Sequence, residues 1–187
     1  MLNLFANDVL EGRTVGGRRV VAPVVNEHLV RAAAGTTMAI GAAAFAYAYF
    51  EHRYWPLQVV TAFFFFEFLV RVSAGISRSP IGLLAGWITQ RQPPDWVSAK
   101  PKRFAWTLAL ALSGAMTFIT NDGIRGWLPR SICLVCLALM WLESVLGLCL
   151  GCEIHGLLVR RGWARKDEAF EICAYSACDV TSRRRSP

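Results

Sequence analysis

Residues 104–120 read FAWTLALALSGAMTFIT, a run of 17 residues without a charged side chain. Three more apolar runs lie at residues 30–50, 57–72 and 131–150, and the last can extend back to Trp127. A helix needs about 20 mostly apolar residues to cross the core of a bilayer. Backbone groups in lipid must also be hydrogen-bonded within their own helix. The sequence therefore predicts an all-α integral membrane protein, a bundle of four spanning helices.

The composition agrees with a membrane protein. Hydrophobic residues make up 55% of the 187 residues and charged residues 18%, whereas soluble domains are about 45–50% apolar and about 25% charged. The net charge is +7, but the basic residues cluster at the ends of the apolar runs. This placement indicates membrane topology rather than a nucleic-acid surface. The first 28 residues lack the continuous apolar core of a signal peptide.

The segments between the runs predict how the chain is organised. Short polar turns are expected at residues 51–56 (EHRYWP) and 121–123 (NDG). The longer connection contains PIGLLAGWITQ, residues 80–90, which is too short to span and is predicted to lie at the interface as an amphipathic helix. We expect an N-terminal segment (1–28), a four-helix transmembrane domain (29–156) and a cysteine-containing tail (157–187).

The lysines and arginines predict the orientation. Four of the 20 lie within residues 13–31, six within 71–103 and seven within 160–185, all on one expected side of the membrane. The other three, Arg53, Arg125 and Arg130, lie in or beside the two short turns. Because basic residues are enriched in cytoplasmic loops, both termini are expected to be cytoplasmic.

Two cysteines, Cys149 and Cys152, lie three residues apart at the expected cytoplasmic end of the fourth helix. On a continuous helix their side chains are neighbours, and their spacing permits a disulfide. Three interpretations stay open: a redox or sulfur-carrying dithiol, small residues for close packing beside Gly147 and Gly151, or metal ligands. A position at a helix C-terminus argues against an activated thiolate, because the negative end of the helix dipole disfavours one.

A second pair, Cys173 and Cys178, lies in the tail with four residues between its members. That spacing is typical of zinc-binding pairs. The tail could therefore complete a four-cysteine zinc site with Cys149 and Cys152, or His155 could replace one of the four. A thiol relay among the same cysteines and two unconnected tail thiols are the alternatives, since permanent disulfides are rare in the cytoplasm.

Two glutamates, Glu67 and Glu143, lie within apolar runs, where carboxylates are costly and mark candidate functional sites. Arg71 follows Glu67 by four residues, a favourable spacing for an ion pair on a helix. Glu143 has no cation at such a spacing, so we expect it near the Glu67–Arg71 pair, where it either ties helices together or handles protons. On a straight helix Glu143 points about 180° away from Cys152, so any action on that thiol requires a break between them.

The chain also resembles a known family. The stretches that carry the resemblance are VNEHLVRAAAG, SRSPIGLLAGWI, KPKRFAW and LESVLGLCLGCEIHGLL, which together cover about Val25 to Leu158. The family is a bacterial four-helix membrane domain of unknown function, similar in architecture to the DoxX-like membrane proteins. Its members are often associated with rhodanese-type sulfurtransferases and thioredoxin-like proteins. The resemblance implies sulfur or thiol chemistry, such cytoplasmic partners, and the bacterial cytoplasmic (inner) membrane.

Three functions remain as hypotheses. The first is a membrane thiol protein that passes electrons or sulfane sulfur between cytoplasmic thiol partners and the membrane. The second is a non-catalytic subunit or anchor, in an oligomer or larger complex, whose cysteines bind zinc or pack helices. The third is a permease for a small sulfur compound, with the two buried glutamates near its path. Cys133 and Cys136 are expected to be core residues, because a buried free cysteine behaves as a small hydrophobe.

Overall fold

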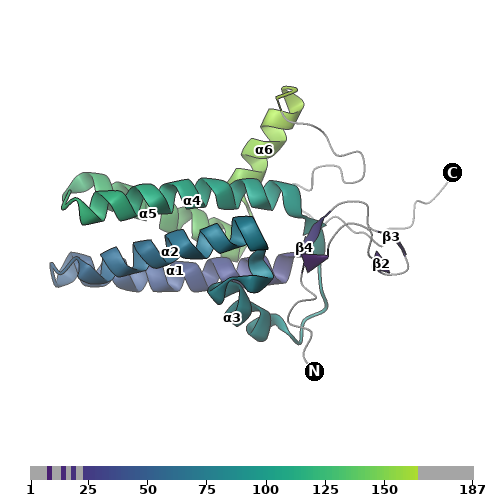
Figure 1. The fold of residues 1–187 in the computed structure, drawn as a ribbon, viewed down its shortest axis with the longest axis horizontal. Helices are drawn as coiled ribbons and strands as arrows, with labels where there is room; N and C mark the ends of the chain where they lie inside the picture. Colours follow the sequence, from purple (N-terminus) through teal and green to yellow (C-terminus); the bar gives the residue numbers. More distant parts are fainter. Residues whose placement is uncertain (1–7, 10–13, 16–17, 20–22, 164–187) are drawn as a thin grey trace.

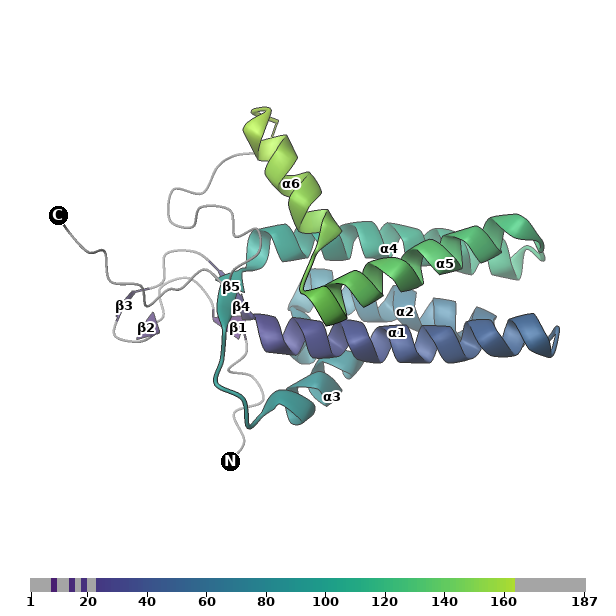
Figure 2. The ribbon, with the colours of Figure 1, turned by 180° about the vertical axis from the view of Figure 1, so that it is seen from behind.

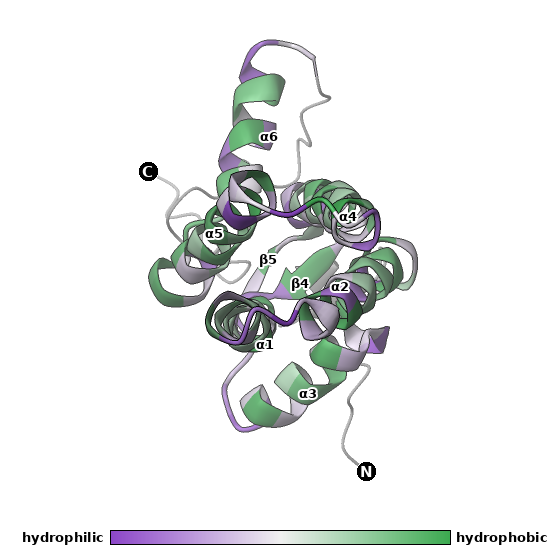
Figure 3. Ribbon diagram, turned by 90° about the vertical axis from the view of Figure 1, so that its left-hand side faces the viewer, coloured by the Kyte–Doolittle hydropathy of each residue, from purple (hydrophilic) through white to green (hydrophobic). Residues whose placement is uncertain are grey.

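The computed structural model describes residues 8–9, 14–15, 18–19 and 23–163, and four long helical segments form its framework (Figure 1). They are α1 (Glu27–Phe50), α2 (Trp55–Ala74), α4 (Ala99–Asn121), and α5 (Trp127–Trp141) continued by the π-helical segment η2 (Leu142–Leu146). All four are long and apolar enough to cross a membrane, and apolar residues cover much of their length (Figure 3). The predicted all-α membrane bundle is confirmed.

The two short connections lie together at one end of the bundle, here called the turn end (Figure 1). Large aromatic side chains are exposed there, namely Phe50, Trp55, Phe118 and Trp127. Aromatic residues are enriched where a membrane meets water, so the turn end has the composition of a membrane boundary.

Between α2 and α4 the chain forms the short helices η1 (Ile76–Arg78) and α3 (Pro80–Thr89). Ser79 caps α3, because its Oγ accepts a hydrogen bond from the Gly82 N–H at 3.1 Å, and Pro80 occupies the first turn, where no donor is lost. One face of α3 is buried against α1 and the other exposes Leu83, Leu84, Trp87 and Ile88. The short helix that the sequence predicted here is present, but the face that it leaves uncovered is apolar, so it is not amphipathic.

A small antiparallel sheet closes the opposite end, here called the strand end. β4 (Val24–Asn26) pairs with β1 (Asp8–Val9) on one side and β5 (Trp96–Ser98) on the other, while β2 (Thr14–Val15) and β3 (Arg18–Arg19) form a separate hairpin. The sequence predicts no strands here, because strands of two or three residues are too short to show alternation.

The pairing of β4 with β5 has a direct consequence for the helices. β4 runs straight into α1 and β5 straight into α4, so the antiparallel pairing starts the two helices from opposite ends of the same short ladder, within reach of long side chains. Two backbone bonds reinforce the junction: Glu27 N–H donates to the Asp95 carbonyl at 2.7 Å, and Ala99 N–H to the Pro23 carbonyl at 2.9 Å. Residues near the starts of α1 and α4 can therefore meet.

The fourth helix does not continue through residue 150 as predicted. Gly147 adopts a left-handed conformation with φ of 69°, and the N–H groups of Gly147 and Leu148 donate to the carbonyls of Glu143 and Leu142, both at 3.1 Å. This pattern ends a helix. A new helix, α6 (Leu150–Arg160), then leaves the bundle at a steep angle (Figures 1 and 2). The expected boundary at residues 156 and 157 falls within α6.

The first turn of α6 packs tightly on α4. A Cβ atom added at Gly151 would lie 2.5 Å from the Cβ and 2.8 Å from the Cα of Ala105, closer than van der Waals contact allows. The absent side chain therefore sets how near α6 approaches α4, as small residues do where membrane helices meet closely.

We expect Gly151→Val to destabilise the protein by about 1–3 kcal/mol, the usual cost of overpacking. The thermal unfolding midpoint in detergent, followed by circular dichroism, should fall relative to the wild type. Leu157→Val introduces the same β-branched side chain at an exposed position of α6 and is the matched control. Equal midpoints for the two variants would contradict the close packing of Gly151.

Candidate functional site

A buried cluster of charges joins three helices at the strand end. The ammonium nitrogen of Lys102, on α4, lies 3.0 Å from Oε2 of Glu27 on α1 and 3.2 Å from Oε1 of Glu143 on η2. The exposed fractions of the three side chains are 7% for Lys102, 15% for Glu27 and 10% for Glu143. The two carboxylates of Glu27 and Glu143 therefore share one ammonium group that is largely shielded from water. Removing one member of such a buried ion pair destabilises a protein, because it leaves a buried charge without a partner.

Arg31 holds the end of the fourth helix from the side of α1. Its Nε donates to the carbonyl of Ser144 at 3.1 Å and its guanidinium NH2 group to that of Val145 at 2.8 Å. Carbonyls in the last turn of a helix lack partners within the helix, so Arg31 satisfies two of them. The Arg31 side chain also lies beside Gly147, where an added Cβ would be 3.5 Å from it. Arg31 thus supports the point at which the helix ends.

Cys149 and Cys152 lie just beyond this break, at the start of α6. Cys149 is the N-cap residue, and its carbonyl accepts the N–H groups of Cys152 at 3.0 Å and Glu153 at 3.1 Å. The predicted position at a helix C-terminus is therefore wrong. The pair sits at an N-terminus, where the positive end of the dipole favours a thiolate, as in Cys-x-x-Cys redox sites.

The two thiols differ in their surroundings. Cys149 is buried and Cys152 is partly exposed. The hydrogen bond between their side chains, together with burial, raises the pKa of Cys152, and the positive charge of Lys102 partly opposes this effect. The contact with Cys149 and burial therefore favour the protonated thiol of Cys152.

A cavity of about 260 Å³ lies between the four spans and reaches Cys149. Cys149 is among its lining residues, with Arg71 and Glu143, whereas Cys152 is not among those that the structure shows lining it. The two members of the pair thus face different surroundings: Cys149 faces the interior of the bundle and Cys152 lies outside the cavity.

The described part of the chain supplies no additional zinc ligand beside Cys149 and Cys152. Within residues 23–163 no group of three or more cysteine, histidine, aspartate or glutamate side chains is arranged to hold a metal ion. The ring of His155 packs against Phe104 of α4, with 5.6 Å between the ring centroids, so it contributes to the contact between α6 and α4. Cys173 and Cys178, the other predicted ligands, lie outside the described residues.

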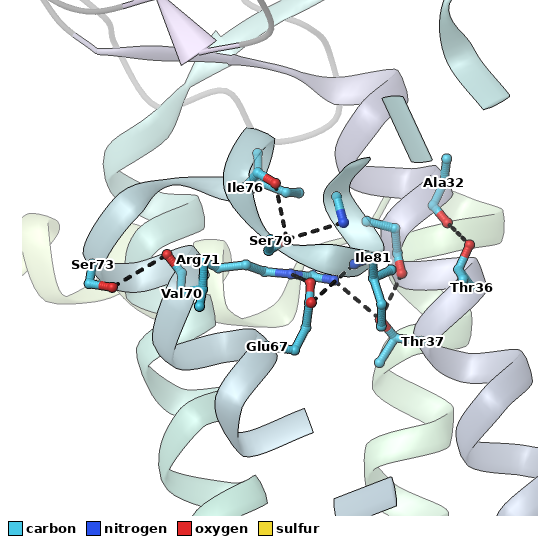
Figure 4. A network of polar contacts seen from close by, with 12 residues as sticks. Ala32, Thr36, Thr37, Glu67, Val70, Arg71, Ser73, Ile76, Ser79 and Ile81 are labelled. Atoms are coloured by element: carbon cyan, nitrogen blue, oxygen red, sulfur yellow. Dashed lines mark hydrogen bonds and ion pairs between the residues drawn. The ribbon is translucent and has the colours of Figure 1, made fainter. Parts of the chain in front are cut away.

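The second buried ion pair is the predicted one between Glu67 and Arg71, 2.7 Å apart and almost fully buried (Figure 4). The other oxygen of Glu67 accepts the N–H of Ile81 at 3.1 Å, and Arg71 donates to the Thr37 hydroxyl at 3.4 Å. The pair therefore joins α2 to α3 and α1. These contacts give Glu67 and Arg71 a clear structural role.

One comparison with known proteins gives a match. The family described as Domain of unknown function (DUF4395) matches residues 25–160. The chain belongs to this family. No curated protein and no solved structure matches it.

The DUF4395 match covers the bundle and all of α6, and so includes the cysteine pair and the charge cluster. The sequence predicts Glu143 near the Glu67–Arg71 pair, and Glu143 and Arg71 line the same cavity, while the direct ion-pair partner of Glu143 is Lys102. Lys102, Glu27 and Arg31 were missed, and Lys102 and Arg31 were counted only as topology markers. The signal available for Lys102 was its place two residues before the apolar run that begins at Phe104.

Cys133 and Cys136 lie on α5 in the half of the bundle near the turn end. Both are partly exposed and both line the cavity. Cys133 also packs against the buried cluster of Ala44, Ala48 and Leu57. They are thus at the edge of the packed interior and line the same cavity as Cys149.

We expect Lys102→Met to destabilise the DUF4395 domain by about 3–5 kcal/mol, because it leaves two buried carboxylates without their cation. The thermal unfolding midpoint in detergent should fall sharply. Arg103→Met removes a neighbouring but exposed cation and should have little effect. Adding Glu27→Gln and Glu143→Gln to Lys102→Met should restore part of the loss. Similar midpoints for Lys102→Met and Arg103→Met would show that the cluster is not the anchor inferred here.

Proposed function

We propose that the protein is a membrane thiol protein whose Cys149–Cys152 dithiol passes electrons or sulfane sulfur between cytoplasmic thiol partners and the membrane. The observation that carries this proposal is the placement of the pair. It lies at a helix N-terminus, between the cavity of the bundle, which Cys149 lines, and the outside, to which Cys152 is partly exposed.

The chemistry that this placement supports is thiol–disulfide exchange. A thiolate of the pair attacks one sulfur of a disulfide, a mixed disulfide forms, and the other sulfur leaves as a thiolate. The second cysteine then attacks the mixed disulfide, closes the Cys149–Cys152 disulfide and releases the remaining thiol. Two electrons and two protons pass from the dithiol to the attacked disulfide. The spacing of the pair within one helical turn makes the second attack intramolecular.

The charge cluster supports this role by positioning the pair. Lys102 and Glu143 tie the start of η2 to α4, and Arg31 bonds the carbonyls of Ser144 and Val145 before the break. The charge of Lys102 also acts on Cys152 and favours its thiolate. Lys102 is therefore a positioning residue with an electrostatic effect on the dithiol.

The proposed orientation places the strand end, with the dithiol, in the cytoplasm of a bacterium and the turn end outside its inner membrane. The excess of lysines and arginines in the segments flanking the strand end supports it. Arg71 and Lys102 are buried in ion pairs, but the exposed Arg78, Arg91, Arg103, Arg160 and Arg161 keep the bias in the same direction. Partners of the thioredoxin-like or rhodanese-like type, implied by the family resemblance, are then on the side where Cys152 is accessible.

The proposal predicts that the reduced protein in detergent forms a Cys149–Cys152 disulfide when challenged with a soluble thioredoxin-like protein in its disulfide form. Removing Cys149 prevents the second attack, so Cys149→Ser should trap a mixed disulfide between Cys152 and the soluble protein. Mass spectrometry of alkylated peptides identifies the cysteines that react.

The double variant Cys149→Ser/Cys152→Ser retains Cys133 and Cys136 and should not oxidise the soluble partner's dithiol or reduce its disulfide. Stoichiometric zinc with all thiols of the pair protected from native alkylation would instead support the structural site. Failure of Cys149 and Cys152 to react with any disulfide would remove the thiol-exchange function.

The orientation predicts opposite labelling at the two ends of the bundle. In a variant without native cysteines, Asp122→Cys at the turn end should react with a membrane-impermeant maleimide added to intact cells. Trp163→Cys, at the end of α6, should react only after the cells are opened. The reverse pattern would overturn the orientation and place the dithiol outside the cytoplasm.

A further inference from the structure

The cavity is elongated along the bundle. Its lining includes Leu57 and Cys133 from the half near the turn end, and Cys149 and Ile154 from the start of α6. α4 and α5 contact each other little, and the lining residues Leu108, Leu150 and Ile154 are also 37–44% exposed on the outside of the bundle. The cavity therefore has a side that faces the surroundings of the spanning helices, which in a membrane are lipid.

The lining specifies an uncharged ligand. Aliphatic and aromatic side chains, such as Phe64, Phe68 and Trp106, dominate it. The charged groups that it contains are already neutralised, because Arg71 is paired with Glu67 and Glu143 with Lys102. A charged ligand would lose its hydration on entering this apolar cavity and would find no unpaired charge of opposite sign, so its binding would be unfavourable.

The size of the cavity suits a small molecule. Drug-sized ligands occupy pockets of about 300–1,000 Å³, and apolar cavities of about 150 Å³ bind single-ring molecules such as benzene. A cavity of about 260 Å³ lies between these limits and fits a molecule of one or two rings or a short chain.

The reactive groups on the cavity wall are thiols. Cys149 lines its strand-end side, and Cys133 and Cys136 line it further along. Thiolates exchange most directly with sulfur–sulfur bonds. We propose that this cavity binds a small, uncharged, apolar disulfide that enters from the bilayer and is reduced at Cys149. The inference rests on the proposed function, since it names the substrate that the dithiol meets on its membrane side.

The reaction balances without a further cofactor. The Cys149 thiolate attacks one sulfur of the bound disulfide, forms a mixed disulfide and expels the first thiolate, which takes up a proton. Cys152 then attacks the Cys149 sulfur, closes the Cys149–Cys152 disulfide and releases the second thiol. One apolar disulfide becomes two thiols, and the dithiol loses two electrons and two protons. A cytoplasmic protein dithiol reduces the Cys149–Cys152 disulfide again from the side of Cys152.

Access through the cavity can be tested with Cys152→Ser, in which the mixed disulfide on Cys149 is trapped. The protein in lipid nanodiscs is treated with diphenyl disulfide, which is apolar, or with oxidised glutathione, which is charged, and the modified cysteine is identified by mass spectrometry. Diphenyl disulfide should modify Cys149 at least about tenfold faster than oxidised glutathione does, relative to the rates of the two reagents with a free thiol in the same membranes.

Filling the cavity, either with a larger side chain or with an unreactive competitor, should slow the modification of Cys149. Ala109 lines the cavity from α4, so Ala109→Phe fills part of it and should slow modification of Cys149 by diphenyl disulfide about tenfold. Ala111→Phe adds the same side chain at an exposed position of the same helix and should change the rate by less than about twofold. An excess of 1,2-diphenylethane, which has the same shape but no sulfur, should compete in the protein without cavity substitutions, so the test does not depend on the folding of Ala109→Phe.

Equal rates with and without 1,2-diphenylethane, or equal effects of Ala109→Phe and Ala111→Phe, would overturn the cavity as the route to Cys149. In that case the proposed function still stands if the dithiol exchanges with the soluble protein disulfide. Loss of exchange with every disulfide, soluble or apolar, would instead remove the proposed function itself.

Discussion

The structure depends on one buried ammonium group. Lys102 makes ion pairs with Glu27 at 3.0 Å and Glu143 at 3.2 Å, and so connects α1, α4 and the end of the fourth spanning helix. Apolar helices in lipid gain little from hydrophobic contact with one another, so packing and polar contacts decide how they associate. The short β4–β5 pairing brings the starts of α1 and α4 within reach of long side chains, and Lys102 then fixes the third helix against both.

The same anchor makes the break in the fourth helix possible. A helix that ends inside a bundle leaves carbonyls without partners, which is costly away from water. Arg31 bonds two of these carbonyls and the left-handed Gly147 allows two further backbone bonds. Because the carbonyls at the helix end are hydrogen-bonded, the chain can start α6 in a new direction. The cysteine pair therefore lies at the beginning of α6 and not at the end of the fourth spanning helix.

The sequence alone predicted most of the framework, because the length and apolar character of the spans follow directly from the thickness of a bilayer. It also identified Glu67 and Arg71, whose spacing within one helix is visible in one dimension. The partner of Glu143 was not predictable in this way, because Lys102 is 41 residues away on another helix and meets it only in the folded bundle. The break at Gly147 was considered but not predicted, since a glycine within an apolar run is common in membrane helices.

The break explains why two cysteines three residues apart can have two environments. On a continuous membrane helix both would lie beside the same neighbours, and the dipole at its C-terminus would disfavour either thiolate. At the start of α6 the pair instead lies where the chain turns out of the bundle, with buried Cys149 on the cavity and Cys152 beyond it. Under the function proposed above, a dithiol in this place would meet an apolar reactant and a soluble protein in succession without moving across the membrane. The change of helix direction gives the two cysteines separate surroundings, and the charges around Lys102 and Arg31 hold the turn in place.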